Sequence, residues 1–100
     1  MLETSVEKKL KKRVKDIGGI APKLVSPGTS GMPDRLVILP NGIVSFVETK
    51  KPKGGKLSAR QRIVHKQLKS LGCDVQTIYS FEEIEAYIAE VHKGCGGNDL

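Results

Sequence analysis

Two acidic residues and a lysine flank a short hairpin in this sequence, and their types suit metal-assisted chemistry. Asp34 precedes an apolar run at 35–39, and Glu48 and Lys50 follow a second run at 43–47. Two carboxylates that face each other across paired strands repel unless a divalent cation lies between them. Such a cation polarises a phosphate and lowers the pKa of a bound water, and a nearby lysine can orient that water or neutralise developing charge. The three residues are therefore a candidate site for phosphoryl transfer.

The loop between the two runs decides whether the acidic residues share a face. A two-residue loop would set Asp34 opposite Thr49 and turn Glu48 to the other face. A three-residue loop at 40–42 suits the composition better, because proline favours the first position of a type I turn and glycine the left-handed position that follows. That register sets Asp34 opposite Glu48, with Lys50 on the same face. The competing interpretation is a surface aspartate and an unrelated Glu-Lys cluster at a sheet edge.

Periodicity and capping signals predict the elements around the hairpin. Apolar residues at helical spacing predict a first helix that ends at the glycine pair 18–19. Residues 20–25 are typical of a short strand, which Pro22 confines to a sheet edge. Capping boxes that open at Ser58 and Ser80 predict two more helices, with a strand at 75–79 between them.

The expected fold follows from this order, which is α-β-β-β-α-β-α. Both faces of the hairpin are apolar, and such a sheet needs helices on both faces. The last strand follows a crossover helix, which predicts parallel pairing. We therefore expect a three-layer α/β/α domain with a mixed four-stranded sheet over residues 1–93, followed by a flexible tail at 94–100.

Charge and composition restrict the possible partners. The chain has 17 Lys and Arg against 11 Asp and Glu, giving a net charge of +6. This excess favours a polyanionic partner, although a merely solvated basic surface is the other interpretation. No apolar run approaches the length of a membrane span, and no signal-peptide pattern is present. We therefore expect a cytoplasmic protein that is neither secreted nor bound to a membrane.

Several separated motifs resemble one branch of a nuclease superfamily. The segments Gly31-Met32-Pro33-Asp34-Arg35 and Val47-Glu48-Thr49-Lys50 are similar to motifs of the VRR-NUC branch of the PD-(D/E)XK superfamily. The first helix, Ser26-Pro27-Gly28, Leu57-Ser58-x-x-Gln61 and Leu71-Gly72-Cys73-Asp74-Val75 resemble that branch too. The resemblance covers roughly residues 1–91 and implies a restriction-endonuclease-like fold, in agreement with the predicted order. It implies a stand-alone type of phage or bacterial origin, which would act in a bacterial cell or an infected host.

The resemblance also implies roles for the central residues. Asp34 and Glu48 would bind Mg²⁺ or Mn²⁺ together with the backbone carbonyl of Thr49. Lys50 would position or activate the attacking water. Gln61 would contact the site from the second helix, although its place in the capping box explains it equally well.

An acidic residue on the first helix would complete the catalytic and metal-binding site. Glu7 is the first choice, because its surroundings resemble the first-helix motif of archaeal Holliday-junction resolvases. Glu3, one turn earlier, is the rival. His65 lies among charged residues in the middle of a helix, and we expect it to be exposed rather than catalytic.

Proteins of this stand-alone type resemble homodimers that act on branched DNA. A four-way junction has two-fold symmetry, which a two-fold dimer matches. The expected function is therefore metal-dependent, structure-selective cleavage of DNA, with Holliday junctions or other branched DNA as the substrate. The alternatives are a flap- or nick-directed nuclease and a non-catalytic DNA-binding module. Phosphate contacts are expected from first-helix lysines and from Lys51, Lys53, Lys56, Arg35, Arg60 and Arg62. Pairing with a structural carboxylate is an equal alternative for Arg35.

Overall fold

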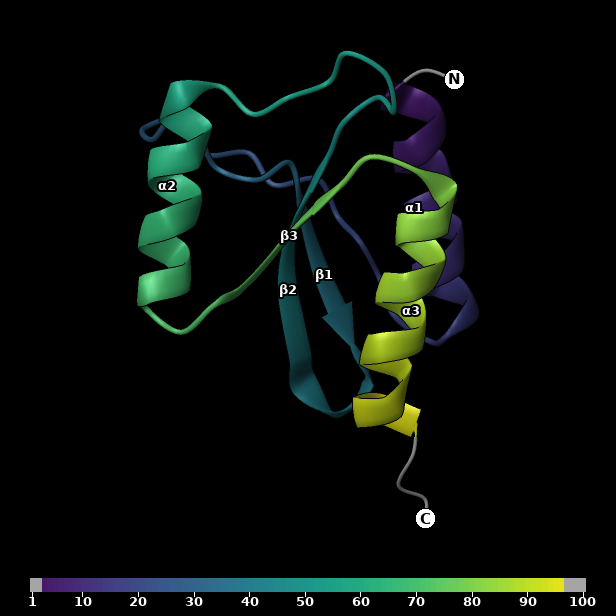
Figure 1. The fold of residues 1–100 in the computed structure, drawn as a ribbon. Coiled ribbons are helices and arrows are strands. Elements are labelled where there is room, and N and C mark those ends of the chain that lie inside the picture. Colours follow the sequence, from purple (N-terminus) through teal and green to yellow (C-terminus); the bar gives the residue numbers. More distant parts are fainter. Residues whose placement is uncertain (1–2, 97–100) are drawn as a thin grey trace.

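Figure 1 shows the fold in a computed structural model, which describes residues 3–96 and the side chains of residues 5–93. The elements in order are α1 (Glu3–Asp16), β1 (Arg35–Leu39), a 3₁₀ turn (Pro40–Gly42), β2 (Ile43–Thr49), α2 (Ala59–Ser70), β3 (Asp74–Ile78) and α3 (Phe81–Gly96). The sheet order is β1-β2-β3. β1 is antiparallel to β2, and β3 is parallel to β2, so the predicted parallel pairing across the α2 crossover is confirmed.

The layers are arranged as the two apolar faces of the hairpin require. α1 and α3 lie on one face of the sheet and α2 on the other (Figure 1), so the three-layer α/β/α fold is confirmed. The larger core fills the space between the sheet and the α1/α3 layer, and it includes Val6, Leu10, Val14, Val37, Val47, Ile78 and Ile84. Burial of each such side chain stabilises the fold by about 1.5–3 kcal/mol. This core therefore fixes β1 and β2, whose adjoining ends carry the predicted polar residues.

The predicted strand at 20–25 does not form, so the sheet has three strands within the described residues rather than four. The segment runs beside β1 and makes only isolated bridges. Ile20 and Ile38 exchange two backbone hydrogen bonds of 2.9 Å, but at the next pair Leu36 donates to Pro22 and no bond can return. Proline has no N–H, so the ladder is interrupted at that point. The four-stranded prediction is wrong for this reason.

The hairpin keeps the predicted register, but its turn has a different conformation. Leu39 pairs with Ile43, so the loop comprises residues 40–42. Asn41 has φ 68° and ψ 18°, and Gly42 also has a positive φ of 74°. Two successive residues are therefore left-handed, where the predicted type I turn needed only the glycine. Asparagine tolerates this region better than most residues, so the strand pairing is unaffected.

The last helix is longer than predicted. α3 continues to Gly96, three residues past the expected domain boundary at 93. A glycine lowers helix stability by only about 1 kcal/mol relative to alanine, so it need not end a helix. The rest of the predicted tail, 97–100, lies outside the described residues. No helix in the described part of the chain is long and apolar enough to cross a membrane.

Candidate active site

The hairpin register brings the two predicted carboxylates to one end of the sheet. Arg35 pairs with Val47, so the next position along places Asp34 across from Glu48. Burial, followed by the negative charge of Asp34, raises the pKa of Glu48 above its ordinary value. The two carboxylates are therefore close enough to interact, as the three-residue loop predicts.

Glu48 is the most enclosed acidic group of this site, with its side chain 5% exposed. Its Oε2 accepts a hydrogen bond from Gln61 Nε2 at 3.1 Å and lies 3.3 Å from Lys50 Nζ. Its other oxygen, Oε1, is buried and has no hydrogen-bond partner in the described part of the chain. A buried polar atom without a partner costs on the order of 1–3 kcal/mol. The site therefore holds one carboxylate oxygen that a ligand could satisfy.

Gln61 serves the helix cap and the site at once. Its backbone N–H donates to Ser58 Oγ at 3.1 Å, and its Oε1 accepts from the Ser58 backbone N–H at 2.9 Å, which completes a capping box. The Nε2 group is left to donate to Glu48. A side-chain amide offers an acceptor and two donors, so the two roles that the sequence left open are compatible.

Thr49 contributes a side chain where the sequence suggested only a backbone carbonyl. Its hydroxyl is fully buried and donates to Asp34 Oδ2 at 3.1 Å. This bond orients the Asp34 carboxylate beside β2. The sequence signal for this contact is a threonine directly after the acidic residue of the motif.

Glu7 binds Arg35 rather than joining the carboxylate pair. Arg35 Nη2 lies 2.9 Å from Glu7 Oε2, Arg35 Nε donates to the same oxygen at 3.0 Å, and Arg35 Nη1 donates to the Ala21 carbonyl. No group of three or more His, Cys, Asp or Glu residues that could hold a metal occurs in the part of the chain described. Glu7 is therefore an outer neighbour of the site. The side chain of its rival, Glu3, lies outside the described residues.

His65 is buried, at 4% exposed, so the expectation of an exposed histidine is wrong. The charged neighbours Arg62 and Lys66 are exposed on the outer side of α2, while Val64 and His65 face inward. Burial, then Lys69 and Lys50, lower the pKa of His65. The local charge density was misleading because helical phase, not the nearest neighbours in sequence, decides which side chain faces the sheet.

Five of the predicted basic residues are exposed, whereas the sixth, Arg35, pairs with Glu7. The loop after β2 exposes Lys51, Lys53 and Lys56, and α2 exposes Arg60 and Arg62. Arg60 Nε donates to Ser30 Oγ at 3.3 Å, and Arg62 Nη1 donates to the Leu57 carbonyl at 3.1 Å. A groove of about 510 Å³ between α1 and segment 19–23 is lined in part by Lys11, Lys15, Lys23 and Arg35.

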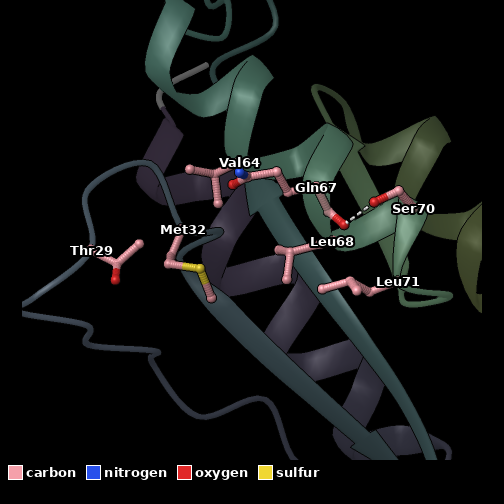
Figure 2. Close-up of a pocket in the computed structure, with 7 residues that line it drawn as sticks. All are labelled: Thr29, Met32, Val64, Gln67, Leu68, Ser70 and Leu71. Carbon is pink, nitrogen blue, oxygen red and sulfur yellow. Dashed lines mark hydrogen bonds between the residues drawn. The ribbon is translucent and has the colours of Figure 1, made fainter.

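A second groove, of about 440 Å³, lies between α2 and the loop before β1 (Figure 2). Met32 from the loop faces it together with Val64 and Leu68 from the helix. None of the residues that line it is a predicted site residue. This groove is therefore a separate feature of the surface.

The fold and the polar cluster together define a class of protein. A three-layer α/β/α domain carries an acidic pair at the open end of a hairpin, with a lysine two residues further on, which is the arrangement of a restriction-endonuclease-like nuclease domain. The family model of the VRR-NUC domain matches residues 3–82. The chain therefore belongs to the VRR-NUC family of nuclease domains, and the predicted resemblance is confirmed.

Individual relatives agree with this assignment. A protein of Acyrthosiphon pisum secondary endosymbiont phage 1, named "Putative nuclease p44", is 53% identical over 73 residues, which cover 73% of this chain and 77% of that protein. A solved structure named "VRR_NUC domain" has a TM-score of 0.83 and 38% identity, and the match covers 87% of this chain and 94% of the other.

Proposed function

We propose that the protein is a structure-selective DNA endonuclease that hydrolyses phosphodiester bonds with Mg²⁺ or Mn²⁺ held by Asp34 and Glu48. The observation that supports it best is the buried Oε1 of Glu48, which has no partner among the described residues and lies near a second carboxylate that opposes its ionisation. A divalent cation between them would satisfy both. Mg²⁺ is commonly held by one or two carboxylates with substrate phosphates and water, so this donor set fits the ion.

The surrounding side chains would hold the two carboxylates for that purpose. Thr49 Oγ1 donates a hydrogen bond to Asp34 Oδ2, and Gln61 Nε2 donates one to Glu48 Oε2. The Thr49 backbone carbonyl is the third proposed ligand. The bound cation would polarise the scissile phosphate and lower the pKa of a water. Glu7 would act in the outer part of the site, by holding Arg35 beside Asp34.

Lys50 is the proposed partner of the attacking water. Its ammonium lies 3.3 Å from Glu48 Oε2 and its side chain is 16% exposed, so it has limited access to solvent. From this position Lys50 would donate a hydrogen bond to the water or to a phosphate oxygen on which negative charge develops. A fixed donor in an enclosed site stabilises such charge more than a solvated one.

Basic surfaces on two sides of the site would hold DNA through its phosphates. The loop that follows Lys50 exposes Lys51, Lys53 and Lys56, and Arg35 lines the α1 groove together with three lysines. Contacts of this kind position a duplex without reading its sequence. They support recognition of DNA shape, and with it a branched substrate such as a four-way junction. A homodimer would present two such sites to opposite strands of the junction.

The test is cleavage of labelled four-way junction, flap, nicked duplex and linear duplex, each in Mg²⁺ and in Mn²⁺. The parent should cut branched DNA faster than linear duplex. Asp34→Asn and Glu48→Gln should each reduce the rate at least ~100-fold with the fold preserved by circular dichroism. The control Lys66→Ala, on the exposed side of α2, should cut at the parent rate. If both site variants cut as fast as the parent, the site is wrong.

Other outcomes separate the alternatives. Preferential cutting of flaps or nicks would identify a flap- or nick-directed nuclease at the same site. Salt-sensitive binding without cleavage in either metal would identify a non-catalytic DNA-binding module. Sedimentation velocity of the free protein would decide the proposed homodimer, because a single monomeric species at all concentrations would contradict it.

A further inference from the structure

His65 is a buried titratable group that the proposed reaction does not yet use. Its Nε2 atom is buried and lacks a hydrogen-bond partner among the described residues. Leaving such an atom unpaired costs on the order of 1–3 kcal/mol, whereas an apolar side chain of similar size would avoid that cost. Core packing alone therefore does not account for a histidine at this position.

The position of His65 on α2 directs it toward the catalytic cluster. Gln61 and His65 are four residues apart, so their side chains are neighbours on one face of the helix, about 5–6 Å between Cβ atoms. Gln61 Nε2 contacts Glu48 Oε2, the same oxygen that lies 3.3 Å from Lys50 Nζ. Gln61 therefore joins the face of α2 that carries His65 to the Glu48–Lys50 pair. In keeping with this placement, the charge of Lys50 is a cause of the lowered pKa of His65, after burial and the charge of Lys69.

We propose that His65 is a positioning residue for Lys50, whose ammonium donates a hydrogen bond to His65 Nε2 when Glu48 engages its ligand. The inference rests on the proposed function. An ammonium has three N–H donors. Within residues 5–93, the one ion pair of Lys50 is with Glu48 Oε2. If a bound cation shares the negative charge of Glu48, the Glu48–Lys50 ion pair would weaken. A second hydrogen-bond acceptor would then be required to hold the Lys50 ammonium in place. A neutral imidazole supplies an acceptor without cancelling the positive charge that faces the phosphate.

The first test separates activity from stability. His65→Leu should melt at or above the parent temperature, because it removes an unpartnered buried polar atom. Its KM should stay within about twofold, while kcat should fall about 10- to 100-fold, the usual range for loss of a supporting contact. His65→Gln places an amide near the position of Nε2 and should recover part of kcat. A His65→Leu variant with the parent kcat would overturn the proposal.

The matched control is the only other histidine of the chain, His92. It is exposed on α3 and outside the proposed site, so His92→Gln should leave KM and kcat unchanged. That variant also simplifies a second measurement, since one imidazole remains to be observed by ¹⁵N NMR. Addition of Mg²⁺ alone should shift the His65 Nε2 resonance in His92→Gln, and much less when Lys50→Met is added.

The NMR outcome does not depend on catalysis. An equal Mg²⁺-induced shift with and without Lys50, or no shift in either protein, would overturn the link between His65 and Lys50. A parent protein that cuts no DNA in Mg²⁺ or Mn²⁺ would instead overturn the proposed function. The two failures are therefore distinguishable.

Discussion

At the scale of single residues, Glu48 occupies an electrostatically unfavourable position in the site. Burial and Asp34 both oppose its negative charge, and Lys50 and Gln61 only partly offset them. An acidic group whose pKa is raised by folding destabilises the folded state once the pH rises above its pKa in the unfolded chain. At neutral pH, Glu48 is therefore retained at the expense of stability, which is a common property of functional sites.

Glu48→Gln should therefore stabilise the protein when no divalent metal is present. The amide oxygen can still accept a hydrogen bond from Gln61, while the opposing charge next to Asp34 is gone. A gain of about 1 kcal/mol would raise the melting temperature by roughly 4–8 °C in a domain of this size. Differential scanning fluorimetry in EDTA at pH 7.5 measures it.

The same experiment repeated in Mn²⁺ provides the control. The parent should gain thermal stability as it binds the ion, because a ligand that binds only the folded state stabilises it. Glu48→Gln should gain little. A lower melting temperature for the variant in EDTA, or equal Mn²⁺ effects on both proteins, would show that the Glu48 charge is not strained in the way described.

At the scale of elements, one side chain of α2, that of Gln61, both caps the start of the helix and contacts Glu48. Ser58→Ala removes half of the capping box and should destabilise the protein by about 1 kcal/mol without changing kcat. Gln61→Glu keeps an acceptor for the Ser58 N–H but places a carboxylate against Glu48. We expect kcat to fall at least ~10-fold in that variant. Urea unfolding and single-turnover cleavage on both proteins would separate the two roles.

The glycines before β1 make a second prediction about α2. Gly31 has φ +88°, and a Cβ there would lie 2.8 Å from the Arg60 carbonyl oxygen and 3.0 Å from Val64. Gly31→Ala should therefore cost more than ~1 kcal/mol, because it combines backbone strain with a clash. Gly28→Ala is the matched control, since a Cβ there meets nothing within 4 Å. Equal urea midpoints for the two variants would show that the loop does not pack tightly on α2.

The elements also show what the sequence could and could not predict. The register of the hairpin was predictable because proline, asparagine and glycine at 40–42 favour a three-residue loop, and that register alone placed Asp34 across from Glu48. The absence of the fourth strand was not predictable in the same way. Residues 20–25 are otherwise suitable for a strand, and the missing N–H of Pro22 alone interrupts their hydrogen bonding to β1. Gln61 was predictable as a cap from local spacing. The inward position of His65 required the phase of α2 against the sheet, which is a tertiary property.

At the scale of the whole molecule, positive charge is spread along two paths that leave the site. One is the exposed loop after β2, which contains Lys51 and Lys53. The other is the α1 groove, which Arg35, Lys11 and Lys15 line in part. α2 and α3 extend toward the opposite end of the sheet (Figure 1). If both paths hold DNA, the two arms of a branch would meet at the acidic pair.

Salt dependence of binding tests whether the α1 groove is one of these paths. Each phosphate neutralised by a lysine steepens the dependence of log K on log salt by about 0.9. Replacing Lys11, Lys15 and Lys23 with alanine should therefore make the slope shallower by roughly 2 to 3. The control variant replaces three exposed lysines that do not line the groove, Lys66, Lys69 and Lys93. It changes the net charge equally but should leave most of the slope. Equal losses in the two variants would mean that only overall charge attracts DNA, and that the groove is not a path for it.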